Sequence, residues 1–259
     1  GGPLPPGGID SGVGAASVSN SLPAGKRLLV IIPAYNEEAS LARVIANVKT
    51  ALPHADIVVI NDGSHDSTAH VGGLAGAYVI TLPYNLGIGA AVQTGFIFAR
   101  DNGYDFTVQV DGDGQHDPGE IGVILSPVIN SQADVIAGAR YIEDRGYITP
   151  WPRRIGIIVL SSLISLSVRR RVTDPTSGFR ASNRRAIEYC AQDYPSDYPE
   201  PESVVQFARA GLRMREVPVT MNPRYGGQSS ITPFRSFYYM VKVILAIIID
   251  LLRNTPKAQ

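Results

Sequence analysis

Residues 106–118 have the sequence FTVQVDGDGQHDP, in which a short apolar run leads directly into an acidic, glycine-containing loop. The run at 106–110 is typical of a strand buried in a sheet. The loop presents Asp111 and Asp113, separated by Gly112. Glycine permits backbone conformations that other residues avoid and lets a ligand approach the chain closely. A buried strand that ends in a polar loop is the pattern from which the fold prediction follows.

This strand belongs to a series of alternating strands and helices. Further apolar runs predict strands at 28–32, 57–60, 78–81 and 135–137. Helical periodicity predicts helices at 37–50, 66–72, 89–100 and 121–128. Glu37 and Glu38 would lie in the first turn of the first helix, where carboxylates are favourable. Repeated βα units predict an α/β fold with a Rossmann-like, mostly parallel sheet and helices on both faces.

Polar loops follow three of the predicted strands. They are Tyr35-Asn36-Glu37, Asp62-Gly63-Ser64 and Asp111-Gly112-Asp113. Parallel strands end at the same edge of a sheet, and ligands of such folds bind beyond that edge. The sequence therefore predicts that the three loops converge on one site.

The acidic loop has the chemistry of a metal site. Asp111, Asp113 and the amide oxygen of Gln115 are hard oxygen ligands suited to Mg²⁺ or Mn²⁺. Such an ion would neutralise a diphosphate leaving group. A plain turn is the alternative, but the two matching loops favour a functional site. His116 could be a further ligand, a support for the loop or a contact to a sugar.

The other two loops suggest a nucleotide. Tyr35 and Glu37 could hold a base by stacking and hydrogen bonding, and Asp62 could accept from a ribose hydroxyl or a base imide. The simpler alternatives are a helix N-terminal acid for Glu37 and an Asx-turn for Asp62. Residues 85–89 (NLGIG) fail as a dinucleotide fingerprint, because Val92 occupies the third glycine position. We expect this segment to be a turn at the pocket edge.

Candidate acceptor residues lie in the second half of the chain. Glu202 could be a general base for a hydroxyl acceptor, or simply an acid at the start of a helix at 203–210. Arg140, Arg180 and Arg224 stand in loop contexts, and guanidinium groups suit phosphates. These alternatives stay open at the level of the sequence.

Composition excludes several function classes. The 259 residues contain 23 Lys plus Arg and 23 Asp plus Glu, so no overall positive field would recruit nucleic acid. The single Cys190 excludes an internal disulfide and a cysteine-rich metal site. Residues 1–25 are rich in Gly, Pro, Ala and Ser without the apolar core of a signal peptide, and we expect a flexible extension there.

Two apolar helical segments suggest contact with a membrane. One, at 152–171, ends in three arginines, and the other, at 233–259, contains the apolar run 243–249. Arg235, Lys242 and Asp250 interrupt the second one, and spanning a bilayer needs about 20 mainly apolar residues. We expect both helices to lie in the membrane interface, or the last to join a homo-oligomer. The remaining residues, 26–232, would form the main domain.

The order of motifs resembles a known family. The motifs are IIPAYNEE (31–38), VINDGSHDST (59–68), NLGIGAAVQTG (85–95), VDGDGQHDP (110–118), AGARY (137–141), DPTSGFR (174–180) and EVPVTMNPRYGGQSSI (216–231). Together they resemble inverting family 2 glycosyltransferases of the GT-A fold, close to the dolichyl- and polyprenyl-phosphate sugar transferases. The resemblance covers residues 28–231.

The resemblance implies roles for individual residues. Pro33, Tyr35, Glu37 and Asp62 would hold the nucleoside, and Asp111, Gly112 and Asp113 would meet the nucleotide and metal, with Asp113 and Gln115 as metal ligands. Arg140 and Arg224 would lie near the phosphates, where Arg140, Arg224 and Asp113 would assist catalysis. The acceptor phosphate would involve the region of Arg154 and Ser229. There the chain departs from the family pattern, because Ser230 stands where many members carry lysine.

We therefore expect sugar transfer from a UDP- or GDP-sugar to a polyprenyl phosphate, catalysed by a peripheral protein on the cytoplasmic face of the membrane. An alternative keeps the donor but uses a hydroxyl acceptor on a glycan or lipid-linked saccharide, with Glu202 as the base. An alternative of another class is a non-catalytic nucleotide-sugar-binding or scaffold protein.

Overall fold

The computed structural model describes residues 22–143 and 151–222, together with Lys242 and Leu245. Most of the predicted N-terminal extension lies outside these residues. So do Arg224, Ser229 and nearly all of the predicted C-terminal helix at 233–259.

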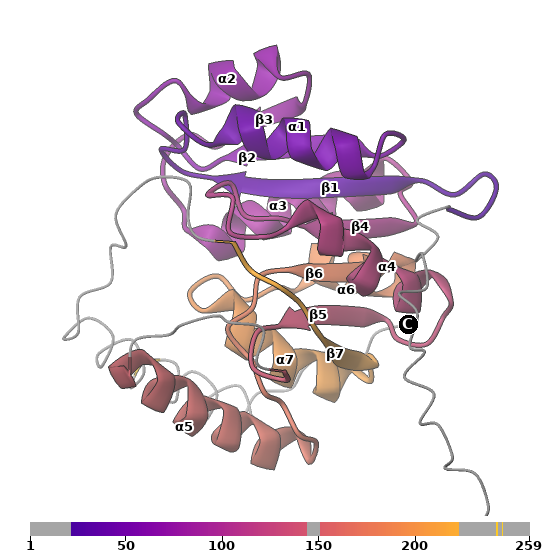
Figure 1. Ribbon diagram of the computed structural model, residues 1–259, viewed down its shortest axis with the longest axis vertical. Coiled ribbons are helices and arrows are strands. Elements are labelled where there is room, and N and C mark those ends of the chain that lie inside the picture. Colours follow the sequence, from indigo (N-terminus) through magenta and orange to yellow (C-terminus); the bar gives the residue numbers. More distant parts are fainter. Residues whose placement is uncertain (1–21, 144–150, 223–241, 243–244, 246–259) are drawn as a thin grey trace, which may run out of the picture.

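The fold is built on one seven-stranded sheet with the order β3-β2-β1-β4-β6-β5-β7 (Figure 1). All neighbouring strands are parallel except β6, which runs antiparallel to both β4 and β5. The mostly parallel α/β sheet is therefore confirmed. The strands are β1 (Leu28–Ala34), β2 (Asp56–Asn61), β3 (Tyr78–Thr81), β4 (Phe106–Gln109), β5 (Val135–Ala139), β6 (Arg180–Asn183) and β7 (Met214–Pro218).

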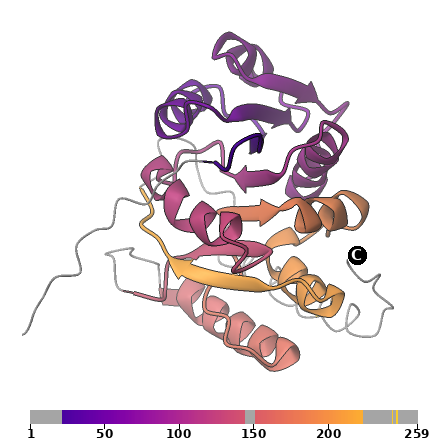
Figure 2. The same cartoon turned by 90° about the vertical axis from the view of Figure 1, so that its right-hand side faces the viewer.

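Helices cover both faces of the sheet (Figures 1 and 2). In β1, Leu29 and Ile31 belong to one buried cluster while Val30 and Ile32 belong to the other. Successive strand side chains point to opposite faces, so burial on both faces explains the continuous apolar run. The helices are α1 (Leu41–Ala51), α2 (Thr68–Leu74), α3 (Ile88–Asp101), the 3₁₀-helix η1 (Pro118–Glu120), α4 (Ile121–Ile129), α5 (Trp151–Val168), α6 (Arg184–Gln192) and α7 (Pro199–Ala210).

Helix α1 begins later than the sequence predicts. It starts at Leu41, so Glu37 and Glu38 lie in the preceding loop and the first-turn prediction is wrong. Tertiary hydrogen bonds hold this loop. The Glu37 N–H donates to Thr68 Oγ1 at 2.9 Å, and the Glu38 N–H donates to Asp66 Oδ2 at 3.1 Å. These bonds hold the loop after β1 against the loop after β2, so Glu37 and Glu38 stay outside the helix.

Helix α5 lies at the end of the molecule opposite α2 (Figures 1 and 2). It buries Leu160 and Ile164, but Ile158 and Leu166 are 56% and 78% exposed. From Ile155 to Val168 the outer side of α5 therefore carries apolar and hydroxyl side chains, and Arg154 is exposed one turn before Ile158. Among the described residues, none of the helices combines the length and the hydropathy that a membrane span requires.

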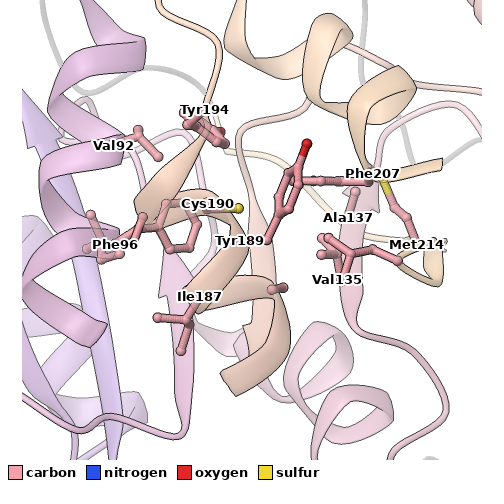
Figure 3. Packing of buried hydrophobic residues seen from close by; sticks show 14 of the residues in the cluster. Val92, Phe96, Val135, Ala137, Ile187, Tyr189, Cys190, Tyr194, Phe207 and Met214 are labelled. Carbon is pink, nitrogen blue, oxygen red and sulfur yellow. The ribbon is translucent and has the colours of Figure 1, made fainter. Parts of the chain in front are cut away.

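Cys190, a residue of α6, is buried in a cluster that also contains apolar side chains of α3 and α7 (Figure 3). Phe96 packs on Tyr194 nearby, with ring centroids 5.5 Å apart. Burial raises the pKa of the Cys190 thiol, and the positive charge of Arg180 opposes the rise only in part. The thiolate is the reactive form of cysteine, so this thiol is inert while the fold is intact.

We predict that Ellman's reagent leaves the native protein unlabelled and labels one thiol after unfolding in guanidinium chloride. The serine variant Cys190→Ser is the control, and it should stay unlabelled in both states. Rapid labelling of the native wild-type protein would contradict the burial of this side chain.

Candidate active site

A cavity of about 410 Å³ opens where β1, β2 and β4 end. All three polar loops contribute to it, so their predicted convergence is confirmed. Asn85 and Gly87 and the first residue of α3, Ile88, form part of its edge, where a pocket edge was predicted. The lining residues are Pro33, Ala34, Tyr35, Glu37, Asp62, Asn85, Gly87, Ile88, Ala91, Asp111, Gly112, Asp113 and Glu200.

The acidic loop is held in a defined shape. Asp113 is 6% exposed, and its Oδ1 accepts the Gln115 N–H at 3.0 Å. Ser40 Oγ donates to the carbonyl oxygen of Gly112 at 2.8 Å. A Cβ at position 112 would stand 3.3 Å from the Pro33 carbonyl oxygen, so glycine permits the close packing of the loops after β1 and β4. Gln115, a predicted metal ligand, is absent from the residues that line the cavity.

His116 supports the loop from behind. Its Nδ1 accepts the Asp111 N–H at 3.0 Å, and its ring stacks on Phe179 with centroids 4.8 Å apart. Burial lowers the pKa of His116 to about 4, although the nearby Asp113 carboxylate opposes the shift. The ring is therefore neutral at pH 7, with its proton on Nε2, because Nδ1 accepts. Of the roles considered from the sequence, this geometry favours the supporting one.

The two carboxylates of the acidic loop fit a divalent cation. In the described residues, no group of three or more His, Cys, Asp or Glu side chains is arranged to hold a metal ion. Asp111 and Asp113 line a cavity, however, and Mg²⁺ is usually bound by one or two carboxylates plus phosphate oxygens and water. The residues present therefore suit an ion shared with a phosphate-bearing ligand.

Asp62 shapes the nucleotide side of the cavity. Its two carboxylate oxygens accept the N–H groups of Leu86 at 2.7 Å and Gly87 at 2.9 Å. These bonds connect β2 to the start of α3. A carboxylate has about four acceptor positions, so Asp62 retains capacity for a ligand. Tyr35 is 42% exposed at the cavity, as a stacking side chain would need.

Arg140 forms a buried, two-pronged ion pair. Its Nε and Nη2 each donate to the Asp174 carboxylate at 2.7 Å, and the two side chains are 8% and 0% exposed. Glu216 in turn accepts the N–H groups of Thr173 and Asp174. Sequence reasoning singled out Arg140 but missed Asp174 and Glu216. The signal was present, because Asp174 opens the motif DPTSGFR and Glu216 opens EVPVTMNPRYGGQSSI.

Arg180 does not reach the cavity, contrary to the prediction of a phosphate contact. It is buried, and its guanidinium donates to Ser177 O, Ser203 Oγ and Glu200 O. These bonds fasten β6 to the first turn of α7. Each of its three nitrogens donates to a partner inside the protein, so its role is structural.

The carboxyl group of α7 that faces the cavity is Glu200, not the predicted Glu202. Burial raises the pKa of Glu200, Arg180 opposes this rise, and the negative charge of Asp111 adds to it. The prediction placed the helix start at 203, whereas α7 begins at Pro199. With the start misplaced, the sequence could not indicate which glutamate points toward the cavity.

Gly178 lies against the acidic loop. A Cβ there would stand 3.1 Å from Gln109 Nε2 and 3.3 Å from Asp111 Oδ1. Both distances are tighter than ordinary van der Waals contact, so an added methyl group would displace the Asp111 carboxylate by a few tenths of an ångström.

We predict that Gly178→Ala weakens Mn²⁺-dependent nucleotide binding by about 10- to 100-fold, as changes next to metal ligands do. Calorimetric titration measures the affinity. Gly73→Ala is the matched control, because a Cβ at position 73 meets nothing within 4 Å. Unchanged binding in Gly178→Ala would show that close packing against position 178 does not fix the position of the Asp111 carboxylate.

A second cavity, of about 380 Å³, lies along α5. It contains two arginines, Arg154 and Arg171, together with the hydroxyl-bearing residues Ser161 and Thr173. Tyr141 forms part of its wall, and the neighbouring Arg140 guanidinium lies 5.3 Å from the centre of the Tyr141 ring. The Arg140–Tyr141 segment thus connects the neighbourhood of the acidic loop with a basic, hydroxyl-rich cavity.

The sequence profile described as "Glycosyl transferase family 2" matches residues 29–190, which include the acidic loop and the ion pair. The chain belongs to this family. It is 30% identical over 216 residues to undecaprenyl-phosphate mannosyltransferase from Micrococcus luteus, with 80% of this chain and 88% of the relative covered. It is 32% identical over 223 residues to polyprenol monophosphomannose synthase from Mycolicibacterium smegmatis, with 80% and 82% covered.

Solved structures support the fold of this family 2 glycosyltransferase. Glucosyl-3-phosphoglycerate synthase from Mycobacterium tuberculosis, crystallised with Mn²⁺ and UDP, superposes with a TM-score of 0.67 at 19% identity. The match covers 89% of this chain and 82% of that one. The sequence-based prediction of a family 2 enzyme with the GT-A fold is confirmed.

Proposed function

We propose that this glycosyltransferase moves a sugar from a nucleotide diphosphate donor, UDP- or GDP-linked, to a polyprenyl phosphate. The observation that carries the proposal is the cavity in which Asp111 and Asp113 face the loops of Tyr35 and Asp62. Relatives at 30% and 32% identity that are named for undecaprenyl-phosphate and polyprenol substrates support the acceptor class.

In the donor half, Pro33, Tyr35, Glu37 and Asp62 would hold the nucleoside, and Asp111, Gly112 and Asp113 the diphosphate side. A bound Mg²⁺ or Mn²⁺ would neutralise the negative charge that develops on the leaving diphosphate. The Mn²⁺ and UDP in the structure of the Mycobacterium tuberculosis enzyme support a divalent metal. Gln115, predicted as a ligand, would have to turn toward the ion from outside the cavity wall.

In the acceptor half, an oxygen of the acceptor phosphate would attack the anomeric carbon while the bond to the diphosphate oxygen breaks. The bonding electrons leave with the diphosphate, and the anomeric configuration inverts. A phosphate is already an anion, so positioning and charge neutralisation can carry the catalysis without a strong base. Among the described groups, Arg154 in the cavity along α5 suits this phosphate, whereas Arg140 is paired with Asp174, lines neither cavity and would act on the phosphate through its charge. Arg224 and Ser229 stay proposals outside the described residues.

The acceptor class implies a membrane. We propose that the domain at 26–232 lies peripherally on the cytoplasmic face, with the outer side of α5 in the lipid interface. Ile158 and Leu166 are exposed there, and burying each such side chain contributes about 1.5–3 kcal/mol. The segment at 233–259 would add a second contact to the membrane or to another copy of the chain.

The proposal is tested by incubating the protein with radiolabelled UDP- or GDP-sugars, Mn²⁺ and a polyprenyl phosphate. Label that is soluble in organic solvent and depends on the metal is the expected result. If no donor yields lipid-soluble label while nucleotide binding persists, the acceptor half of the proposal fails and the donor half stands.

Glu200 favours a second candidate, transfer to a hydroxyl acceptor. This reaction needs a base, and a carboxyl group with a raised pKa that faces the cavity is suited to that role. We predict that Glu200→Gln lowers kcat for a hydroxyl acceptor about 10²- to 10⁴-fold while donor binding persists.

Glu202→Gln is the matched control, because it neutralises an acid two residues away that does not line the cavity. Near-normal turnover in Glu200→Gln with the preferred acceptor would exclude the base role and favour the phosphate acceptor.

A further inference from the structure

A third cavity, of about 890 Å³, shares no lining residue with the donor cavity, and it meets the cavity along α5 at Arg171, Val172 and Thr173. Two of its walls are β7, at the edge of the sheet, and the chain that follows the C-terminal end of α5. Part of α7 completes it. Its apolar lining includes Val168, Val204, Leu212 and Met214. We call this cavity the β7 groove.

The β7 groove carries an excess of positive charge. Arg170, Arg171, Arg213 and Arg215 all line it, against a single acid, Glu216. Glu216 is already occupied by the backbone N–H groups of residues 173 and 174.

Most of this positive charge is not neutralised by the fold. Arg213 is paired with Asp134 at 3.2 Å. Arg170 donates to the Met214 carbonyl oxygen but, like Arg171 and Arg215, it has no ion pair with a carboxylate of the described residues. An apolar floor with a cationic rim is complementary to an anion that carries an apolar chain.

The position of the groove specifies what kind of anion. Its rim contains the arginines that follow α5, and the outer side of α5 exposes Ile158, Val159, Leu163 and Leu166. A lipid surface that covers these side chains would bring headgroups to the C-terminal end of the helix. A soluble acidic peptide would gain nothing from this apolar face.

We propose that the β7 groove binds the phosphate headgroup of an anionic phospholipid. This goes beyond the proposed function, in which the membrane only supplies the acceptor, and it requires no catalysis. The site would hold the enzyme on anionic membranes in a fixed orientation, because α5 and the groove would contact the lipid together.

The test is co-sedimentation of the full chain with vesicles of phosphatidylcholine alone or mixed with phosphatidylglycerol. Wild type should prefer the anionic vesicles, and the double variant Arg170→Gln/Arg215→Gln should lose roughly tenfold or more of that preference. The single variant Arg215→Gln keeps the test decisive if the double variant misfolds, because Arg215 is exposed and its replacement should not disturb the fold. Arg43→Gln removes one charge from an exposed position of α1, as Arg215→Gln does from β7, and should leave the preference unchanged.

Further measurements distinguish binding of the headgroup from purely apolar binding and from binding of an acidic peptide. Leu166→Ser should weaken binding to both kinds of vesicle alike, because it removes only apolar contact. Equal binding of wild type to both vesicles, or an unchanged preference in both groove variants, would overturn the proposal. So would groove-dependent binding of poly-glutamate without vesicle binding, which would indicate a peptide site. Nucleotide titration of the same variants should show unchanged donor binding.

Discussion

Asp113→Asn is expected to abolish Mn²⁺-dependent nucleotide binding and to slow sugar transfer on the order of 10²- to 10³-fold. A metal that neutralises leaving-group charge contributes several kcal/mol to the transition state, and each 1.36 kcal/mol corresponds to about tenfold in rate. Asn keeps the shape of the side chain but removes its negative charge. Its oxygen can still accept the Gln115 N–H, so the loop should keep its conformation.

Asp117→Asn is the matched control within the same loop. Asp117 lies outside the cavity, where its Oδ1 accepts the Gly119 N–H at 2.9 Å and starts η1. Calorimetry with UDP and GDP, with and without Mn²⁺, should separate the two variants, while their thermal unfolding should be alike. Metal-dependent binding at wild-type strength in Asp113→Asn would contradict the assignment of the acidic loop, and with it every transferase mechanism proposed above.

The sequence predicts the donor cavity well because the signals there are local. Buried parallel strands appear as apolar runs, and each loop begins where a run ends. Tyr35, Asp62 and Asp113 could be brought together by topology alone, since parallel strands end at one edge. Predicting this cavity did not require knowledge of which side chains contact one another.

Tertiary partners could not be predicted in the same way. Arg140 and Arg180 look equivalent in the sequence, as arginines beside small residues. In the structure one pairs with Asp174, and the other donates to Ser203 and to the carbonyl oxygens of Glu200 and Ser177. All of these partners except Ser177 lie 20 or more residues away in the sequence, so the local sequence does not distinguish the two cases.

Strand β6 was missed for a related reason. Its sequence, Arg180-Ala181-Ser182-Asn183, has no apolar run, yet the first three residues are buried. Arg180 is buried through its hydrogen bonds, and Asn183 caps α6 by accepting the Ala186 N–H. Burial of polar side chains by specific partners leaves no hydrophobic pattern, so periodicity does not detect such a strand.

Asp174→Asn should have the largest effect on stability, a loss of about 3–5 kcal/mol in the free energy of unfolding. Both members of the Arg140–Asp174 pair are at most 8% exposed, so the variant removes the negative charge that Asp174 places beside a buried guanidinium. For a domain of this size the loss corresponds to a decrease in Tm of roughly 6–20 °C. The exposed pair Lys26–Asp105 is the control, and Lys26→Gln should cost less than about 1 kcal/mol.

A second substitution separates the lost charge pair from lost packing. Adding Arg140→Met to Asp174→Asn removes the buried positive charge as well, while the Asn oxygen can still accept the backbone N–H of position 140, as Asp174 Oδ2 does at 3.0 Å. The double variant should therefore recover much of the lost stability in urea unfolding. If Asp174→Asn costs no more than Lys26→Gln, the pair is not a buried ion pair. If the double variant is no more stable than the single one, the damage lies in the loop geometry that Glu216 holds, and the loss of the charge pair is not its cause.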